Sequence, residues 1–154
     1  MTLRLLVALL SAAPLLAAGC RQETAVRPRA YDALALATGH WEWDGTSYSG
    51  GRHTPATVGF TRQLVFTADG QVVITHNHQP NKTTPYALAM GSVPACGSTE
   101  AVPVITYETD SDVGNNDRKT YRLTKSGEGQ QLVLTGDLTC VKKGAVETYR
   151  WVPE

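Results

Sequence analysis

The chain has 154 residues, and its 14 lysines and arginines balance its 14 aspartates and glutamates. A formal net charge of zero argues against a nucleic-acid-binding protein and against a polybasic membrane-surface patch, because both need an excess of positive charge. Charged residues make up only 18% of the chain, which also carries 14 glycines and 8 prolines, so long charged helices and coiled coils are not expected. The length fits a single domain.

Residues 1–19 have the three-part pattern of an export signal peptide. Arg4 supplies a positive charge, residues 5–16 are almost entirely apolar, and residues 17–19 are small. The apolar run of about 12 residues is shorter than the roughly 20 residues that a transmembrane helix needs. We therefore expect residues 1–19 to act as a cleaved signal and not as a membrane span.

The sequence Ala17-Ala18-Gly19-Cys20 resembles the processing site of bacterial lipoproteins. This resemblance implies acylation of the Cys20 sulfur, with palmitate among the expected chains, and cleavage just before Cys20. It departs from the family at Ala17, where leucine is usual. An ordinary secreted protein, cut at Ala18 or Gly19, is the alternative.

Two or three acyl chains would hold the protein lastingly on a bilayer, since each buried methylene contributes roughly 0.8 kcal/mol. We expect a protein of the bacterial cell envelope, lipid-anchored on the periplasmic face or the cell surface. Residues 20–38 are predicted to form a flexible tether, with at most one or two helical turns in the Ala/Leu-rich stretch 30–37.

Two cysteines, Cys96 and Cys140, remain once Cys20 is assigned to lipid. An even number in an exported protein suggests a disulfide. A bridge here would close a loop of about 44 residues and stabilise the fold by roughly 4 kcal/mol in the chain-entropy account. Two separate buried thiols are the alternative.

From His40 onward, apolar and polar residues alternate with the period of β-strands. We predict strands over 39–48, 60–67, 72–76, 83–90, 101–109, 119–125, 131–135 and 145–152. Eight short strands separated by turn signals are typical of an antiparallel sandwich or barrel. With eight strands, a barrel interior is either just filled by side chains or holds one small ligand.

The clearest turn in this pattern is Asp69-Gly70, which stands between two strand-like runs. Asp-Gly favours a two-residue type I′ turn, because both central positions of that turn need positive φ. A loop of this length places Phe66 opposite Val73 across the hairpin.

Two segments resemble the lipocalin or calycin group: Gly39-His40-Trp41 in the first strand and Tyr149-Arg150-Trp151 in the last. The order of Trp41-x-Trp43, Gly50-Gly51, Thr54-Pro55, Gly59 and Leu64-x-Phe66 after a lipoprotein signal resembles the small lipocalin-like lipoproteins of bacteria. The resemblance covers about residues 39–152, with the domain placed at 39–154. It implies an all-β, antiparallel, up-and-down barrel of eight strands.

The same resemblance implies that Trp41 plugs the barrel floor and that Arg150 lies over its ring. Such a cation–π contact contributes about 0.5–2 kcal/mol, depending on burial. It requires the face of the last strand that carries Arg150, and not the face that carries Trp151, to point inward.

Two stretches of the sequence carry residues that could bind a metal ion. His76-x-His78 places two imidazoles on one face of a strand, which suits Zn²⁺ or Cu²⁺ if a third ligand converges. Residues 110–117 form an acidic, Gly-containing stretch that offers oxygens to Ca²⁺, although it lacks the EF-hand pattern. The ordinary alternatives are a solvated strand end and a wet hairpin loop, and we expect neither a metal nor another cofactor.

Catalytic motifs are missing from the sequence: there is no G-x-S-x-G, H-E-x-x-H or phosphate-binding loop. Glu42 and Asp44 form an acidic pair beside the tryptophans, and two acids on an exposed strand face are ordinary. We therefore expect a protein without enzymatic activity.

An aromatic cluster is the remaining functional candidate, and it is read either as the lining of an apolar pocket or as a solid core. Its members are Trp41, Trp43, Phe60, Phe66 and Tyr121, with Arg150 at the barrel floor. Our leading hypothesis is a monomeric, membrane-anchored lipoprotein whose barrel binds a small apolar ligand and no nucleic acid. The alternative is a non-catalytic interaction or structural module with a filled barrel.

Overall fold

A computed structural model of the chain describes residues 34–35, 38–93, 97–109, 116–126, 129–137, 139–141 and 144–154. The structure does not describe the predicted signal peptide, Cys20, most of the tether, Cys96 or residues 110–115 of the acidic stretch. The lipidation and disulfide predictions therefore stay predictions.

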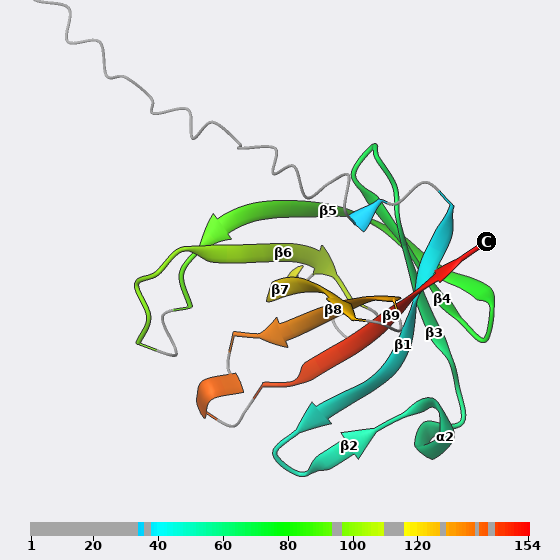
Figure 1. Cartoon of the computed structure of the whole chain (residues 1–154), viewed down its shortest axis with the longest axis horizontal. Coiled ribbons are helices and arrows are strands. Elements are labelled where there is room, and N and C mark those ends of the chain that lie inside the picture. The colour runs from blue at the N-terminus through cyan, green and yellow to red at the C-terminus, as the bar shows by residue number, and fades with distance from the viewer. Residues whose placement is uncertain are drawn as a thin grey trace, which may run out of the picture.

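The described residues form an antiparallel β-structure with two short helical segments. Its elements are β1 (Gly39–Tyr48), β2 (Gly51–His53), α2 (Pro55–Val58), β3 (Arg62–Phe66), β4 (Gln71–His76), β5 (Gln79–Gly91), β6 (Val102–Glu108), β7 (Asn116–Ser126), β8 (Gly129–Gly136), the 3₁₀ turn η2 (Thr139–Val141) and β9 (Val146–Pro153). Every strand from β3 to β9 pairs with its neighbour in sequence, β3 pairs with β1, and β9 returns to pair with β1. The chain is thus a closed, up-and-down, eight-stranded barrel, as predicted, with the short β2 beside β1 (Figure 1).

Alternate residues of each barrel strand point inward and fill most of the interior. The buried apolar side chains of this core are Leu34, Trp41, Trp43, Leu64, Phe66, Val72, Ile74, Tyr86, Leu88, Ile105, Tyr107, Tyr121, Leu132, Leu134 and Tyr149. The period of two in the sequence is the cause, because successive β-residues face opposite sides of a sheet. Closure also leaves the barrel strands without free edges.

The hairpin between β3 and β4 differs from the predicted one. Thr67 N–H donates to the Gln71 carbonyl (2.8 Å) and Gly70 N–H donates to the Thr67 carbonyl (3.1 Å), so the loop has three residues and not two. Gly70 adopts a φ of 83°, the left-handed conformation that ends such a loop. As a result Phe66 pairs with Val72 and not with Val73.

The contact between the first and last strands also differs from the predicted one. The side chain of Arg150 is 59% exposed, and its Nη2 lies 2.6 Å from Glu42 Oε2 on the outer face. Trp151 packs against Trp41 instead, edge to face, with ring centroids 5.2 Å apart. The reason is register: Trp41 pairs with Trp151, and directly paired residues share a face of the sheet.

The packed domain also begins before the predicted boundary at Gly39. Leu34 is buried, with 1% of its surface exposed, and its carbonyl accepts a hydrogen bond of 3.1 Å from Trp41 Nε1. Leu34, which lies in the predicted tether, therefore belongs to the hydrophobic core.

Candidate functional site: a charged cavity at one end of the barrel

The aromatic cluster predicted from sequence forms packed core. Trp41, Trp43, Phe66 and Tyr121 are each at most 7% exposed, and Phe60 is partly buried and stacked on Trp43 at 5.7 Å between ring centroids. The apolar interior is therefore filled where these five side chains lie.

The interior is hollow at the end of the barrel where β1 ends and β9 begins. A cavity of about 160 Å³ opens there, lined by Arg62, Leu64, Ile74, His76, Tyr107, Thr109, Asp117, Lys119, Glu147 and Tyr149. Its volume is similar to the roughly 150 Å³ cavity that holds a benzene ring in an engineered protein. Solvent reaches it, because the side chains of Arg62 and Asp117 on its wall are 26% and 37% exposed.

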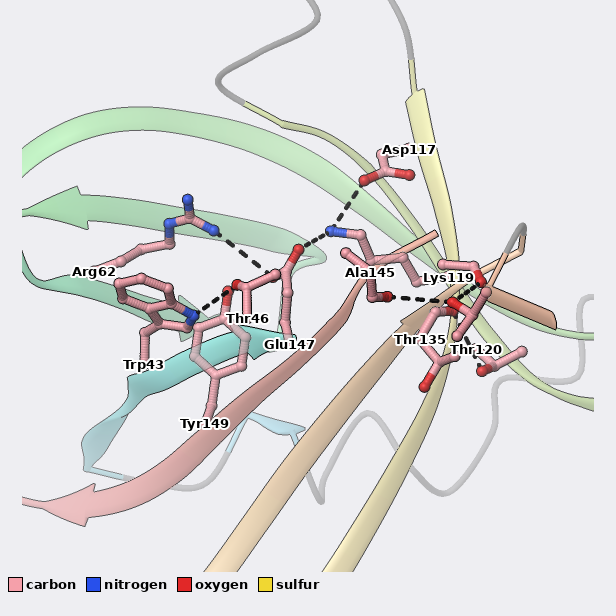
Figure 2. A network of polar contacts seen from close by, with 12 residues as sticks. Trp43, Thr46, Arg62, Asp117, Lys119, Thr120, Thr135, Ala145, Glu147 and Tyr149 are labelled. Atoms are coloured by element: carbon pink, nitrogen blue, oxygen red, sulfur yellow. Dashed lines mark hydrogen bonds and ion pairs between the residues drawn. The ribbon is translucent and has the colours of Figure 1, made fainter. Parts of the chain in front are cut away.

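Glu147 lies at the centre of the polar contacts in this cavity (Figure 2). Lys119 Nζ donates to Glu147 Oε1 and the Tyr149 hydroxyl donates to Oε2, each at 2.6 Å. Lys119 also pairs with Asp117 at 3.0 Å, and Arg62 Nη1 approaches Glu147 Oε2 at 3.7 Å. Two carboxylates and two cations thus meet, while Glu147 and Lys119 are only 7% and 6% exposed.

Strand parity positions these groups. Glu147 and Tyr149 stand two residues apart on the inner face of β9, as Asp117 and Lys119 do on β7. Arg62 is the first residue of β3, and its guanidinium carbon lies 5.4 Å from the centre of the Trp43 ring. The ring shields one face of the guanidinium, so its donors are directed along the cavity wall.

The charges hold one another in their ionised forms. Burial alone would raise the pKa of Glu147, but Lys119, Tyr149 and Arg62 together keep that pKa below its usual range. Burial works against charged Lys119 and Arg62 in the same way, and nearby Glu147 and Tyr149 more than offset it, so both pKa values are raised. Burial and the Glu147 charge raise the pKa of Tyr149, which stays a neutral donor.

The stability of the fold should therefore depend on pH through Glu147. Its folded pKa is lower than the ordinary 4.5, so its contribution is present above about pH 4.5 and is lost as pH falls through the folded value. Urea unfolding of the protein and of Glu147→Gln at pH 7 and pH 3 measures this contribution. We expect the difference between the two proteins to shrink at pH 3, and a difference independent of pH would contradict the assignment.

Of the two stretches considered for metal ions, the structure describes the histidine pair, whereas residues 110–115 of the acidic stretch lie outside the described residues. His76 ends β4 and faces the cavity, whereas His78 lies in the following turn, so the pair does not share a strand face. Within the described ranges, no group of three or more histidine, cysteine, aspartate or glutamate side chains is placed to hold a metal ion. Of the acidic stretch 110–117, the described Asp117 is engaged by Lys119.

The acidic pair Glu42 and Asp44 lies outside the barrel, where both carboxylates face Arg150 at 2.6 and 3.7 Å. Burial raises the pKa of Asp44, with a smaller rise from Glu42 and an opposing effect of Arg150. This arrangement is an ion-pair cluster on a strand face.

A second hollow lies outside the sheet, over β6, β7 and β8. This outer groove has a volume of about 680 Å³ and is lined mainly by apolar atoms of Val93, Ser98, Val102, Pro103, Thr120, Tyr121, Arg122, Leu123, Val133 and Thr135. It is larger than the charged cavity and differs from it in chemistry.

Comparisons of this chain with protein-family models, with curated proteins and with solved structures find no match. Among the described residues, no helix has both the length and the apolar character needed to cross a membrane.

The sequence prediction did not include the charged cavity, although part of its signal was present. Lys119 shares strand parity with Tyr121 and Leu123, and Arg62 shares parity with Leu64. When two neighbouring or facing strands each carry a charged residue with the parity of their core residues, part of the interior is expected to be polar. Glu147 gives no such signal, because the family resemblance implies that the Arg150 face of the last strand, and not the Glu147 face, points inward.

Proposed function

We propose that this protein is a membrane-anchored lipoprotein of the bacterial envelope whose barrel binds a small ligand in the charged cavity and performs no catalysis. The signal-like segment, the site at Cys20 and the barrel that follows support the anchored form. The cavity supports binding, since a few convergent polar groups at the mouth of a barrel are typical of a ligand site.

The single observation that carries the ligand class concerns Arg62. Its Nε is buried and has no hydrogen-bond partner within the part of the chain that the structure describes. Lys119, by contrast, is shared by two carboxylates at 2.6 and 3.0 Å. Arg62 Nη1 lies 3.7 Å from Glu147 Oε2, which is too far for a hydrogen bond, so a ligand oxygen in the cavity that accepts from this guanidinium would be favoured.

The ligand is therefore a small molecule with a carboxylate or similar acceptor group, no larger than about a benzene ring. A planar guanidinium suits a carboxylate because it offers parallel N–H donors. The apolar ligand expected from sequence stays a second candidate. The observation that favours it is the apolar lining of the 680 Å³ outer groove, because the aromatic interior is filled.

Thermal unfolding in increasing acetate at constant ionic strength tests the leading proposal. A ligand that binds only the folded protein stabilises it by about 2.7 kcal/mol at a concentration one hundred times its Kd. We expect acetate to raise the midpoint of the protein and not that of Arg62→Met. The matched control is Arg150→Met, which removes an exposed arginine also paired to a glutamate. An equal rise in the protein and Arg62→Met would contradict the proposal.

Membrane fractionation of Cys20→Ser tests the anchor separately. Removing the thiol removes the acylation site, so we expect the protein to move from the membrane fraction to the soluble fraction. Cys140→Ser is the control and should stay with the membrane. Retention of Cys20→Ser in the membrane would contradict the anchor and leave the acetate result unaffected.

A further inference from the structure

Two histidines that are distant in sequence converge on one side chain on the outer face of the barrel. The terminal amide nitrogen of Gln63 donates a hydrogen bond to each ring, to His40 Nε2 at 3.0 Å and to His78 Nδ1 at 3.2 Å. The other end of that amide, Oε1, accepts a hydrogen bond of 3.0 Å from the Thr75 hydroxyl. His40 and Gln63 belong to the paired strands β1 and β3, and His78 belongs to the turn between β4 and β5.

These separations match those between neighbouring ligands of a tetrahedral metal ion. Bonds of about 2.0–2.1 Å place adjacent ligand atoms roughly 3.3 Å apart, which is close to both amide–imidazole distances. Imidazole nitrogens are favoured ligands of Zn²⁺ and Cu²⁺. Turning the Gln63 amide by half a rotation would present Oε1 to the two rings. The Thr75 hydroxyl tolerates this exchange, because it donates or accepts equally well.

The backbone at His78 gives an independent reason to consider this residue functional. Asn77 and His78 have φ values of 50° and 62°, the left-handed region that both central residues of a two-residue hairpin turn occupy. Glycine is the usual residue at the second of these positions, and a side chain there is disfavoured. Strained positions of this kind cluster at ligand sites.

The turn is also held in place. Asn77 N–H donates to the Thr61 carbonyl at 3.0 Å, and Asn77 Oδ1 accepts from Thr61 N–H at 2.9 Å. These two bonds tie the turn to the residue just before β3, so His78 is fixed relative to Gln63 before any ligand arrives. Such preorganisation lowers the cost of binding.

We propose that His40, His78 and Gln63 form a binding site for one divalent transition-metal ion, with Cu²⁺ and Zn²⁺ as the fitting ions. The two imidazoles and the Gln63 amide oxygen supply three ligands, and water completes the coordination. Glu42 pairs with Gln63 across the strands, but Arg150 engages its carboxylate at 2.6 Å, so it is not counted as a ligand. This site is separate from the charged cavity, so a chain that binds no metal here would leave the proposed function unaffected.

Zinc titration of the full-length chain in detergent tests the proposal, with Zn²⁺ binding read by competition with a chromophoric chelator. We expect one site that His40→Gln and His78→Gly each weaken at least tenfold and that Gln63→Leu also weakens. His53→Gln is the control, because His53 contacts Tyr48 outside this site, and its affinity should equal that of the parent.

The His78→Gly variant removes the imidazole without disturbing the fold, because glycine readily adopts the positive φ of this turn position. We expect it to unfold at or above the parent's midpoint without metal and to lose the rise that Zn²⁺ gives the parent. With Cu²⁺, nitrogen hyperfine couplings should report two imidazoles in the parent and one in His40→Gln. Equal Zn²⁺ affinity in the parent, His40→Gln and His78→Gly would overturn the proposal.

Discussion

Replacing Glu147 by glutamine is expected to lower the free energy of unfolding by about 3 kcal/mol or more at pH 7. The substitution keeps the shape of the side chain but removes the charge that compensates Lys119, which is only 6% exposed. Breaking one partner out of a buried ion pair typically costs about 3–5 kcal/mol, since the other charge stays buried. Urea unfolding followed by tryptophan fluorescence measures the loss.

The chain offers a matched control in Glu42→Gln. Glu42 also sits on a barrel strand and pairs with a cation at 2.6 Å, but its partner Arg150 is 59% exposed. Exposed ion pairs contribute at most about 1 kcal/mol, so this variant should lose little. Equal losses in Glu147→Gln and Glu42→Gln would show that burial does not set the strength of the Glu147 pair.

A double variant separates the charge pair from the packing around it. Replacing Lys119 by methionine and Glu147 by leucine together removes both charges, so neither is left buried without the other. Asp117 and Arg62, which also pair with them, are more exposed. Buried ion pairs replaced by apolar residues of similar size are often neutral or stabilising. We expect the double variant to lose less stability than Glu147→Gln alone. A loss equal to the summed losses of Lys119→Met and Glu147→Leu would show that the two side chains are not coupled.

Replacing Trp41 by alanine is the second large expected effect, at about 3–5 kcal/mol. Trp41 has no exposed surface, and it packs on Trp151 where β1 meets β9. Its loss would leave a cavity at the seam that closes the barrel. Thermal and urea unfolding measure the cost, and Tyr48→Ala, which truncates a side chain that is 41% exposed, should change stability by less than about 1 kcal/mol.

Trp41→Phe serves where the alanine variant does not fold. Phenylalanine keeps most of the packing but removes the indole N–H that donates to the Leu34 carbonyl at 3.1 Å. Leaving that buried carbonyl without its partner costs about 1–3 kcal/mol. We also expect faster proteolysis near Leu34 in this variant, and an unchanged cleavage rate would show that Trp41 does not hold that segment.

Gly39 is a further constraint at the same seam. It has a φ of 140°, and a Cβ built there would lie 2.6 Å from a ring carbon of Trp151. The glycine before the tryptophan thus allows the last strand to approach the first.

The alternation of side chains determined the barrel and much of its core. A repeat of two places alternate residues on one face, and Trp41, Trp43 and Leu64 are inside for that reason. The same alternation is compatible with Lys119 inside beside Tyr121. A cation is buried only with a partner, however, and the sequence does not reveal that partner.

Tertiary structure alone decided which face of β9 points inward and which side chains meet across the barrel. Each strand offers two faces, and pairing with β1 selects the one that carries Glu147, Tyr149 and Trp151. The three-residue loop before β4 likewise places Val72, and not Val73, opposite Phe66. The charged cavity and the convergence of His40 and His78 follow from register between distant strands, which local sequence does not encode because a shift of one residue reverses every side chain.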